Sequence, residues 1–97
     1  MEKLIIPEQN IINAVCVYIA RQKNTIPEEV EVELMYDDDD SGFTAEAYVN
    51  GQQQFLSTLN LIEALRMTLQ EFMNLDPNST GIELILDDEQ GIIAAVH

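Results

Sequence analysis

The chain has 97 residues, which is the size of one domain and leaves no room for a second hydrophobic core. Its 18 Asp and Glu residues face only 4 Lys and Arg residues, so the formal net charge is −14, and binding to nucleic-acid phosphates or to an anionic membrane surface is excluded. Because 46% of the residues are apolar, we expect residues 1–97 to fold as a single domain with most acids on its surface.

The first predicted element is an amphipathic helix that begins near Pro7 and has Arg21 and Lys23 in its last turn. Proline suits the first turn of a helix, and the helix dipole favours cations in the last. Apolar residues lie at the spacing of one helix face, and others extend the apolar surface almost all round. This pattern fits central packing in the domain or a homodimer interface through helix one, and its β-branched residues would also suit a strand. The face consists of Ile11, Ala14, Val15, Tyr18 and Ile19, extended by Ile12, Cys16, Val17 and Ala20.

Two segments with alternating apolar and polar residues follow, 30–37 and 43–50, and each predicts a strand with one solvent-facing side. The Asp-rich stretch between them ends in Gly42, so we predict that the two strands form a hairpin. Asn50-Gly51 is typical of a second hairpin turn, which predicts a short third strand from Gln52 to Leu56.

The second predicted helix has an apolar stripe on one side and charged or amide residues on the other. Its start is expected to be capped by Asn60 with Glu63, or one turn earlier by Ser57 or Thr58. The apolar stripe consists of Leu61, Ile62, Leu65, Leu69, Phe72 and Met73.

Turn residues at 76–81 end this helix, and two more strands follow, 82–86 and 92–96, joined by a turn at Gly91. The predicted order is therefore helix, two or three strands, helix, two strands, or α-β-β-(β)-α-β-β. Short connections between successive strands favour antiparallel pairing. We therefore predict an α+β fold: a two-layer sandwich with a mostly antiparallel sheet of four to five strands and both helices on one face.

The solvent-facing side of the predicted sheet would carry Glu31, Glu33, Glu46 and Glu83. Carboxylates two residues apart on a strand lie about 7 Å apart and repel by roughly 0.6 kcal/mol per pair in water. A face kept acidic against this repulsion indicates a binding surface, although charge also serves solubility. We therefore predict a non-enzymatic interaction module that binds a basic protein through these glutamates or through the acidic turns. A decoy that mimics a nucleic-acid polyanion is a further alternative that the net charge permits.

The turn that follows the first strand resembles half of a calcium-binding loop. Asp37, Asp39 and Ser41 place oxygen atoms at alternate positions before Gly42. The twelfth position, which is a bidentate acid in an EF-hand, is Tyr48, so the loop is not an EF-hand. A domain that binds Ca²⁺ or Mg²⁺ through Asp37, Asp39 and Ser41 is therefore an alternative function. The half-pattern recurs at Asp76, Asn78 and Thr80 before Gly81, with Asp87 at the twelfth place.

Groups suited to catalysis are scarce. Cys16 lies in an apolar helical stretch, where a thiol is inert and has a raised pKa. His97 is the single histidine and the last residue, a poor position for a general base. The sequence contains no phosphate-binding glycine loop, nucleophile motif or Cys/His metal spacing. We therefore expect no enzymatic activity, no catalytic residue and no cofactor, apart from the Ca²⁺ or Mg²⁺ considered above.

The sequence favours a cytoplasmic location. The longest apolar run, residues 14–20, is far shorter than the roughly 20 residues needed to span a bilayer. The apolar run near the start is too short for a signal peptide. With one cysteine, the chain cannot form an internal disulfide, which suits a reducing compartment.

Three stretches carry a distinctive pattern: EVELMYDDD at 31–39, IEALR at 62–66 and IELILDDEQGIIA at 82–94. In these stretches the chain resembles the small YxcD-like proteins of Bacillus and relatives, and the resemblance covers nearly the whole chain. It implies a cytosolic bacterial protein of unknown function. It assigns no role to any residue.

Overall fold

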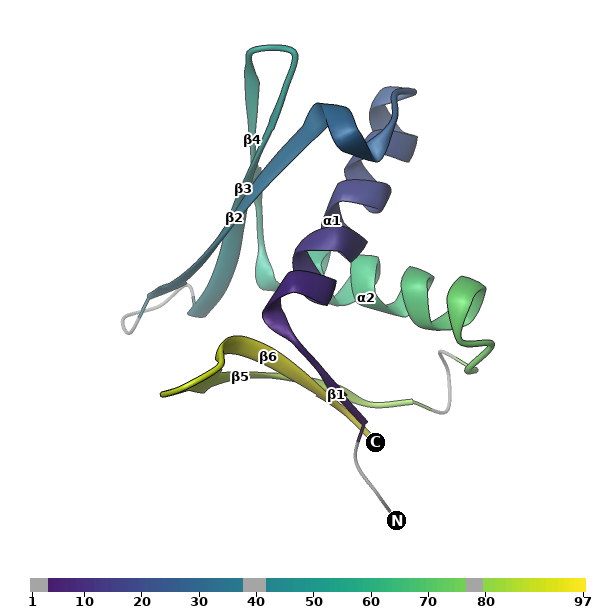
Figure 1. The fold of residues 1–97 in the computed structure, drawn as a ribbon, viewed down its shortest axis with the longest axis vertical. Helices are drawn as coiled ribbons and strands as arrows, with labels where there is room; N and C mark the ends of the chain where they lie inside the picture. Colours follow the sequence, from purple (N-terminus) through teal and green to yellow (C-terminus); the bar gives the residue numbers. More distant parts are fainter. Residues whose placement is uncertain (1–3, 38–41, 77–79) are drawn as a thin grey trace.

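The computed structural model describes residues 4–37, 42–76 and 80–97 (Figure 1). In these residues the chain forms two α-helices, a short 3-10 helix and six strands. The α+β class predicted from the sequence is therefore confirmed. The elements in chain order are β1 (Leu4–Ile6), α1 (Glu8–Lys23), η1 (Pro27–Glu29), β2 (Val30–Asp37), β3 (Gly42–Val49), β4 (Gln52–Leu56), α2 (Thr58–Phe72), β5 (Ile82–Asp87) and β6 (Gly91–Val96).

The strands form two three-stranded antiparallel sheets, in the orders β2-β3-β4 and β1-β6-β5. The prediction of one sheet of four to five strands is wrong on this point. Short turns fix the pairing within each hairpin, but α2 lies between β4 and β5 and lets the last hairpin pair elsewhere. That hairpin takes β1 as its third strand, with Leu4 opposite Val96. The sequence pattern does not predict β1, because three residues are too few to show alternation.

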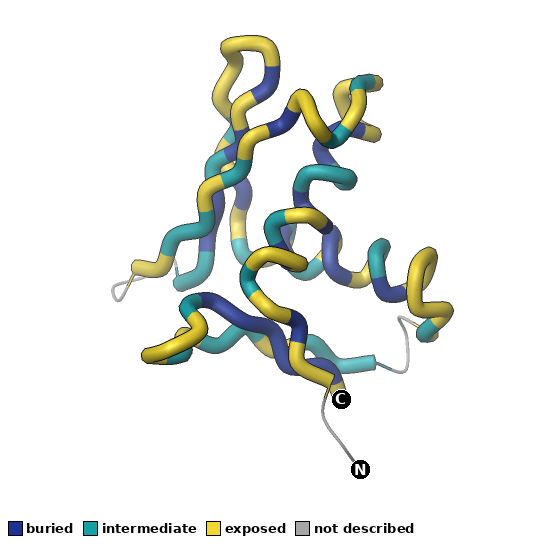
Figure 2. Tube along the Cα trace, viewed as in Figure 1, coloured by how far each residue is buried: buried dark blue, intermediate teal, exposed yellow. Residues whose placement is uncertain are grey.

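Helix α1 lies at the centre of the molecule, beside the β2-β3-β4 sheet and crossed by α2 (Figure 1). Its stripe of Ile11, Val15 and Ile19 is fully buried, and none of its large apolar residues is exposed. Figure 2 shows the buried residues gathered where α1 faces the two sheets and α2. Packing within one chain thus buries the central stripe of this helix and leaves Ile12, Cys16 and Val17, which extend it, partly exposed. A homodimer through helix one stays a prediction.

Helix α2 begins with a capping box at Ser57. The Ser57 hydroxyl accepts a hydrogen bond from the Asn60 backbone N–H at 3.3 Å, and the Asn60 Oδ1 accepts one from the Ser57 backbone N–H at 3.1 Å. Leu61, Leu65 and Leu69 are buried, as the stripe predicts. The stripe's last members, Phe72 and Met73, are instead 65% and 45% exposed, because the helix runs past the edge of the core. Neither α1 nor α2 is long and apolar enough to cross a membrane.

The β3–β4 hairpin closes at Asn50-Gly51, as predicted. Both residues have positive φ angles, 52° and 80°, and they join the paired residues Val49 and Gln52. Two consecutive positive φ angles define the tight turn for which this dipeptide is favoured.

The β5–β6 hairpin is fastened to the start of α1. The Glu8 carboxylate accepts a hydrogen bond from the backbone N–H of Ile92 at 2.9 Å. Gly91 makes room for this contact, because a Cβ atom at that position would lie 2.6 Å from the Glu8 Oε2 atom. Its φ of 79° also disfavours any other residue. Glu8 thus connects two elements that are far apart in the sequence.

Candidate functional site

The outer side of the β2-β3-β4 sheet combines acidic and aromatic residues. Side chains alternate between the two sides of a strand, so Glu46 and Tyr48 of β3 lie on the outer side of the sheet, away from the buried Ala45 and Ala47. The strand register puts Glu31 opposite Tyr48, and Glu33 opposite Glu46, which in turn lies opposite Phe55 of β4. We call this surface the acidic face and define it by Glu31, Glu33, Glu46, Tyr48 and Phe55.

Within the acidic face, two carboxylates oppose each other directly. Glu33 and Glu46 are cross-strand partners, and like charges in such positions destabilise a sheet. At about 5 Å in water their repulsion amounts to roughly 0.8 kcal/mol. The Tyr48 hydroxyl donates a hydrogen bond to Glu46 Oε2 at 2.5 Å. This bond, with some desolvation and the negative charges of Glu46 and Glu33, raises the pKa of Tyr48.

A hollow of about 460 Å³ lies at the end of the acidic face next to η1. It shares Glu31 and Tyr48 with the face and adds two further acids, Glu28 and Glu29 of η1. None of the described residues that line it is basic. The negative surface therefore extends from the sheet into a concave region large enough to admit a side chain.

In the parts of the chain that the structure describes, the carboxylates of Glu31, Glu33 and Glu46 have no basic partner. The ion pair between Arg21 and Glu71 joins α1 to α2 instead. The charge of the acidic face is thus not neutralised from within the described residues.

Glu83 does not belong to the acidic face. It lies on β5, exposed and opposite Ala95, in the other sheet. The prediction that it shares a sheet with Glu31, Glu33 and Glu46 is wrong. The alternating pattern indicates which side of a strand is exposed to solvent, but it does not indicate which strands pair. Glu31, Glu33 and Glu46 do share one side of one sheet, and their role in partner binding stays a prediction.

The proposed metal ligands are only partly described. Asp37 ends β2 and lies opposite Gly42, so the hairpin forms where predicted. Asp39 and Ser41 lie outside the described residues, as does Asn78 of the second half-pattern. Within 4–37, 42–76 and 80–97, no three His, Cys, Asp or Glu residues are grouped closely enough to hold a metal ion. Metal binding at Asp37, Asp39 and Ser41 stays a prediction.

Asp87, the twelfth residue of the second half-pattern, has a structural role. Its Oδ1 accepts hydrogen bonds from the backbone N–H groups of Glu89 at 2.8 Å and Gln90 at 3.0 Å. These bonds lower the pKa of Asp87, the bond from Gln90 contributing most. Asp87 therefore closes the β5–β6 turn.

Cys16 and His97 are placed as the sequence suggests. The Cys16 thiol donates a hydrogen bond to the Val30 carbonyl at 3.5 Å, and burial raises its pKa, as predicted. The backbone of His97 pairs with Gly81 through two hydrogen bonds, of 2.6 and 3.0 Å.

The aromatic part of the acidic face is not predicted from the sequence alone. Tyr48 lies two residues after Glu46, so the alternation along β3 places both side chains on the same side of the strand. The sequence could therefore have indicated that Tyr48 belongs to this face. Phe55 joins the face only through the register of β4 on β3, and Glu28 and Glu29 join it only through the shape of the hollow.

Comparisons with known proteins assign the chain to a family. Residues 1–89 match a family described as a protein of unknown function, DUF2653. The chain is similar to the uncharacterised protein YxcD of Bacillus subtilis (strain 168), with 34% identity over 94 residues that cover 97% of this chain and 92% of the relative. No solved structure matches. The resemblance seen in the sequence is confirmed, and the chain belongs to the DUF2653 family of proteins of unknown function.

Proposed function

We propose that the chain is a non-enzymatic interaction module that binds a basic protein through the acidic face. One observation carries this proposal: three carboxylates and two aromatic rings share one side of a sheet, and the carboxylates have no basic partner among the described residues. Tyr48 and Phe55 are 37% and 57% exposed, so both rings are available to a ligand.

This combination suits arginine. A guanidinium group donates paired hydrogen bonds to carboxylates and also stacks on aromatic rings. A guanidinium between Glu33 and Glu46 would replace their mutual repulsion with two attractions. The concave region at Glu28, Glu29 and Glu31 offers room for a second cationic side chain.

The charge of the whole chain supports the same partner class. A net charge of −14 attracts basic proteins over long range and speeds their association. Such attraction is screened by salt, since the Debye length falls from about 10 Å at 0.1 M to about 3 Å at 1 M ionic strength. Binding through the acidic face should therefore weaken as salt is added.

Calorimetric titration with an arginine-rich peptide tests the proposal. The first variant combines Glu31→Gln, Glu33→Gln and Glu46→Gln. The control variant combines Glu83→Gln, Asp88→Asn and Glu89→Gln, three exposed acids of the β5–β6 hairpin. Each variant removes three negative charges, so both have a formal net charge of −11. We expect the first to lose at least tenfold in affinity and the control to lose much less.

Two results contradict the proposal. Equal losses in both variants would show that diffuse charge attracts the peptide, as in a polyanion decoy, and not the acidic face. Binding that does not change between low and high salt would show that the carboxylates do not provide the attraction.

A further inference from the structure

Strand β2 lies at an edge of its sheet. In the described residues it pairs with β3 only, in a register that runs without interruption over all eight residues of the strand. Both backbone groups of its first residue, Val30, are used away from β3. The Val30 N–H donates a hydrogen bond to the Pro27 carbonyl, and the Val30 carbonyl accepts one from the Cys16 thiol at 3.5 Å. We call the side of β2 that points away from β3 the open edge.

The backbone groups of Val32, Leu34 and Tyr36 point to the open edge. Residues of an antiparallel pair alternate between bonding to the neighbouring strand and pointing away from it. Since Val30 points away from β3, so does every second residue after it. In the part of the chain that the structure describes, no backbone hydrogen bond from another segment closes this edge. Figure 1 shows β2 diverging from α1 toward the β2–β3 turn, so the helix lies near the start of the edge and not along it.

The open edge is the longest of the four sheet edges in the described residues. β2 has eight residues, whereas β5 has six, β4 has five and β1 has three. β2 also carries Glu31 and Glu33 of the acidic face, whereas β4 carries no charged residue. Charged side chains on an edge normally prevent pairing with another strand. Here the charge is all negative between Val30 and Asp37, so it repels acidic strands and attracts basic ones.

The two sides of β2 determine which sequence fits beside it. On the acidic face, an added strand would place alternate side chains about 5 Å from Glu31 and Glu33, where arginine or lysine can pair with them. On the other side, Val32 and Leu34 pack against the core and remain partly exposed, so apolar side chains fit there. A segment in which basic and apolar residues alternate satisfies both sides. The β2 strand of a second copy does not, because it would bring glutamates against glutamates.

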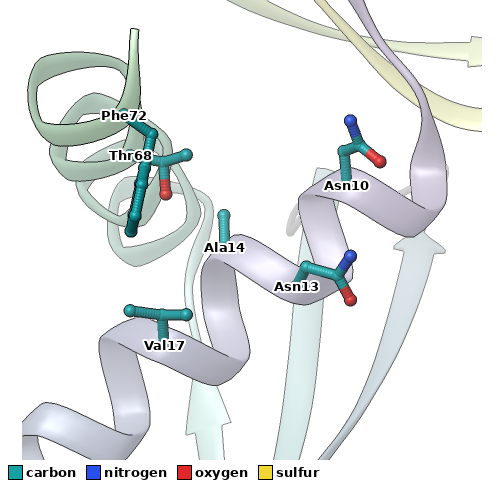
Figure 3. A pocket seen from close by; sticks show the side chains of 6 residues that line it. All are labelled: Asn10, Asn13, Ala14, Val17, Thr68 and Phe72. Carbon is teal, nitrogen blue, oxygen red and sulfur yellow. The ribbon is translucent and has the colours of Figure 1, made fainter. Parts of the chain in front are cut away.

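We propose that the basic partner binds as an added β-strand on the open edge, through an extended segment in which basic and apolar residues alternate. This inference rests on the proposed function and specifies the form of the partner. The acidic face supplies the charge, and the backbone groups of Val32, Leu34 and Tyr36 supply the alignment. The hollow of about 310 Å³ between α1 and α2 supplies neither (Figure 3). None of the described residues that line it is charged, and helical backbone groups bond within their own helix.

Two peptides of the same composition test the proposal. Both contain equal numbers of arginine and valine, alternating in one peptide and separated into two blocks in the other, so their charges are equal. At the same salt concentration we expect the alternating peptide to bind at least tenfold more tightly, since only alternation puts all arginines on one side of a strand. Two N-methylated forms of the alternating peptide, one methylated at the valines and one at the arginines, extend the test. Because only alternate N–H groups of a strand point to its neighbour, one form should lose binding and the other should keep it.

Hydrogen exchange measured by NMR locates the contact. The amides of Val32, Leu34 and Tyr36 should exchange quickly in the free protein and at least tenfold more slowly when the alternating peptide is bound. The control is the amide of Leu84 in β5, an edge strand of the other sheet. It also points away from its neighbouring strand, because it lies three residues after Gly81, which exchanges two hydrogen bonds with the backbone of His97. Its exchange should not change.

Three results would overturn the added strand and leave the acidic face as the binding surface. They are equal binding of the alternating and block peptides, equal effects of the two N-methylated forms, and fast exchange of the three β2 amides in the complex. Failure of every arginine-rich peptide to bind would instead overturn the proposed function, and the added strand with it.

Discussion

Carboxylates serve different purposes in two regions of this molecule. Where α1 meets the β5–β6 hairpin, Glu8 and Asp87 accept hydrogen bonds from backbone N–H groups that need an acceptor. On the acidic face, Glu33 and Glu46 lie opposite each other without a basic partner among the described residues. The first pair holds the fold together, and the second opposes it. A count of acids cannot separate these roles, but removing single acids can.

The largest effect should come from Glu8→Ala. It leaves the half-buried backbone N–H of Ile92 without its charged acceptor, which should lower the free energy of unfolding by about 1–3 kcal/mol. Urea unfolding measures this change. Glu8→Gln keeps an oxygen acceptor and should recover part of the loss. If Glu8→Ala has the same free energy of unfolding as the unmodified protein, Glu8 does not hold the β5–β6 hairpin to α1. The contrast between stabilising and destabilising carboxylates is then wrong.

Glu33→Gln should have the opposite sign. Removing one of two facing charges should raise the free energy of unfolding by about 0.5–1 kcal/mol at low salt, and the gain should shrink at high salt. Glu83→Gln is the control, because Glu83 is an exposed strand residue opposite Ala95. A gain of the same size at Glu83 would show that any lost charge stabilises this chain.

Asp87→Asn should change how stability depends on pH. The backbone bonds lower the folded-state pKa of Asp87 below its ordinary value of 3.8, so its ionised form stabilises the fold above pH 3.8. This contribution is lost as the pH falls through the lowered pKa. The difference in melting temperature between the protein and the variant should be greatest near neutral pH and shrink below 3.8. A difference that is constant with pH would contradict this.

Calcium should have the smallest effect. A specific site raises the melting temperature once calcium exceeds its dissociation constant. Micromolar calcium should leave the melting temperature unchanged, and millimolar calcium should raise it slightly by screening the acids. A clear rise at micromolar calcium that Asp37→Asn abolishes would establish the metal site and displace the interaction module as the leading function.

Local patterns predict much of this fold. The 3.6-residue spacing along α1 and α2 and the alternation in β2 and β3 need only neighbouring residues, and the Asn50-Gly51 turn is specified by its own dipeptide. The sequence predicts the cap of α2 only as one of several alternatives: Ser57 caps the helix, and the cap at Asn60 with Glu63 is wrong.

Pairing over long range is what the sequence does not reveal. The three-residue β1 pairs with β6 from the other end of the chain, and the β5–β6 hairpin does not join the β2-β3-β4 sheet, which keeps Glu83 off the acidic face. The apolar stripe on α2 likewise cannot show where the core ends, because that depends on which other elements pack against the helix. In the structure the core ends before Phe72. The acidic face follows from sequence in its three glutamates, whereas Phe55 depends on register.

Mapping by NMR is the most direct test of the central claim that the acidic face binds a basic partner. An unlabelled arginine-rich peptide is added to the isotope-labelled protein, and the backbone amide shifts are followed. We expect the largest changes in β2 and β3, around Glu31, Glu33 and Glu46, with little change in α1, α2 or the β5–β6 hairpin. Changes spread evenly over all acidic segments, or centred on the β5–β6 hairpin, would contradict it.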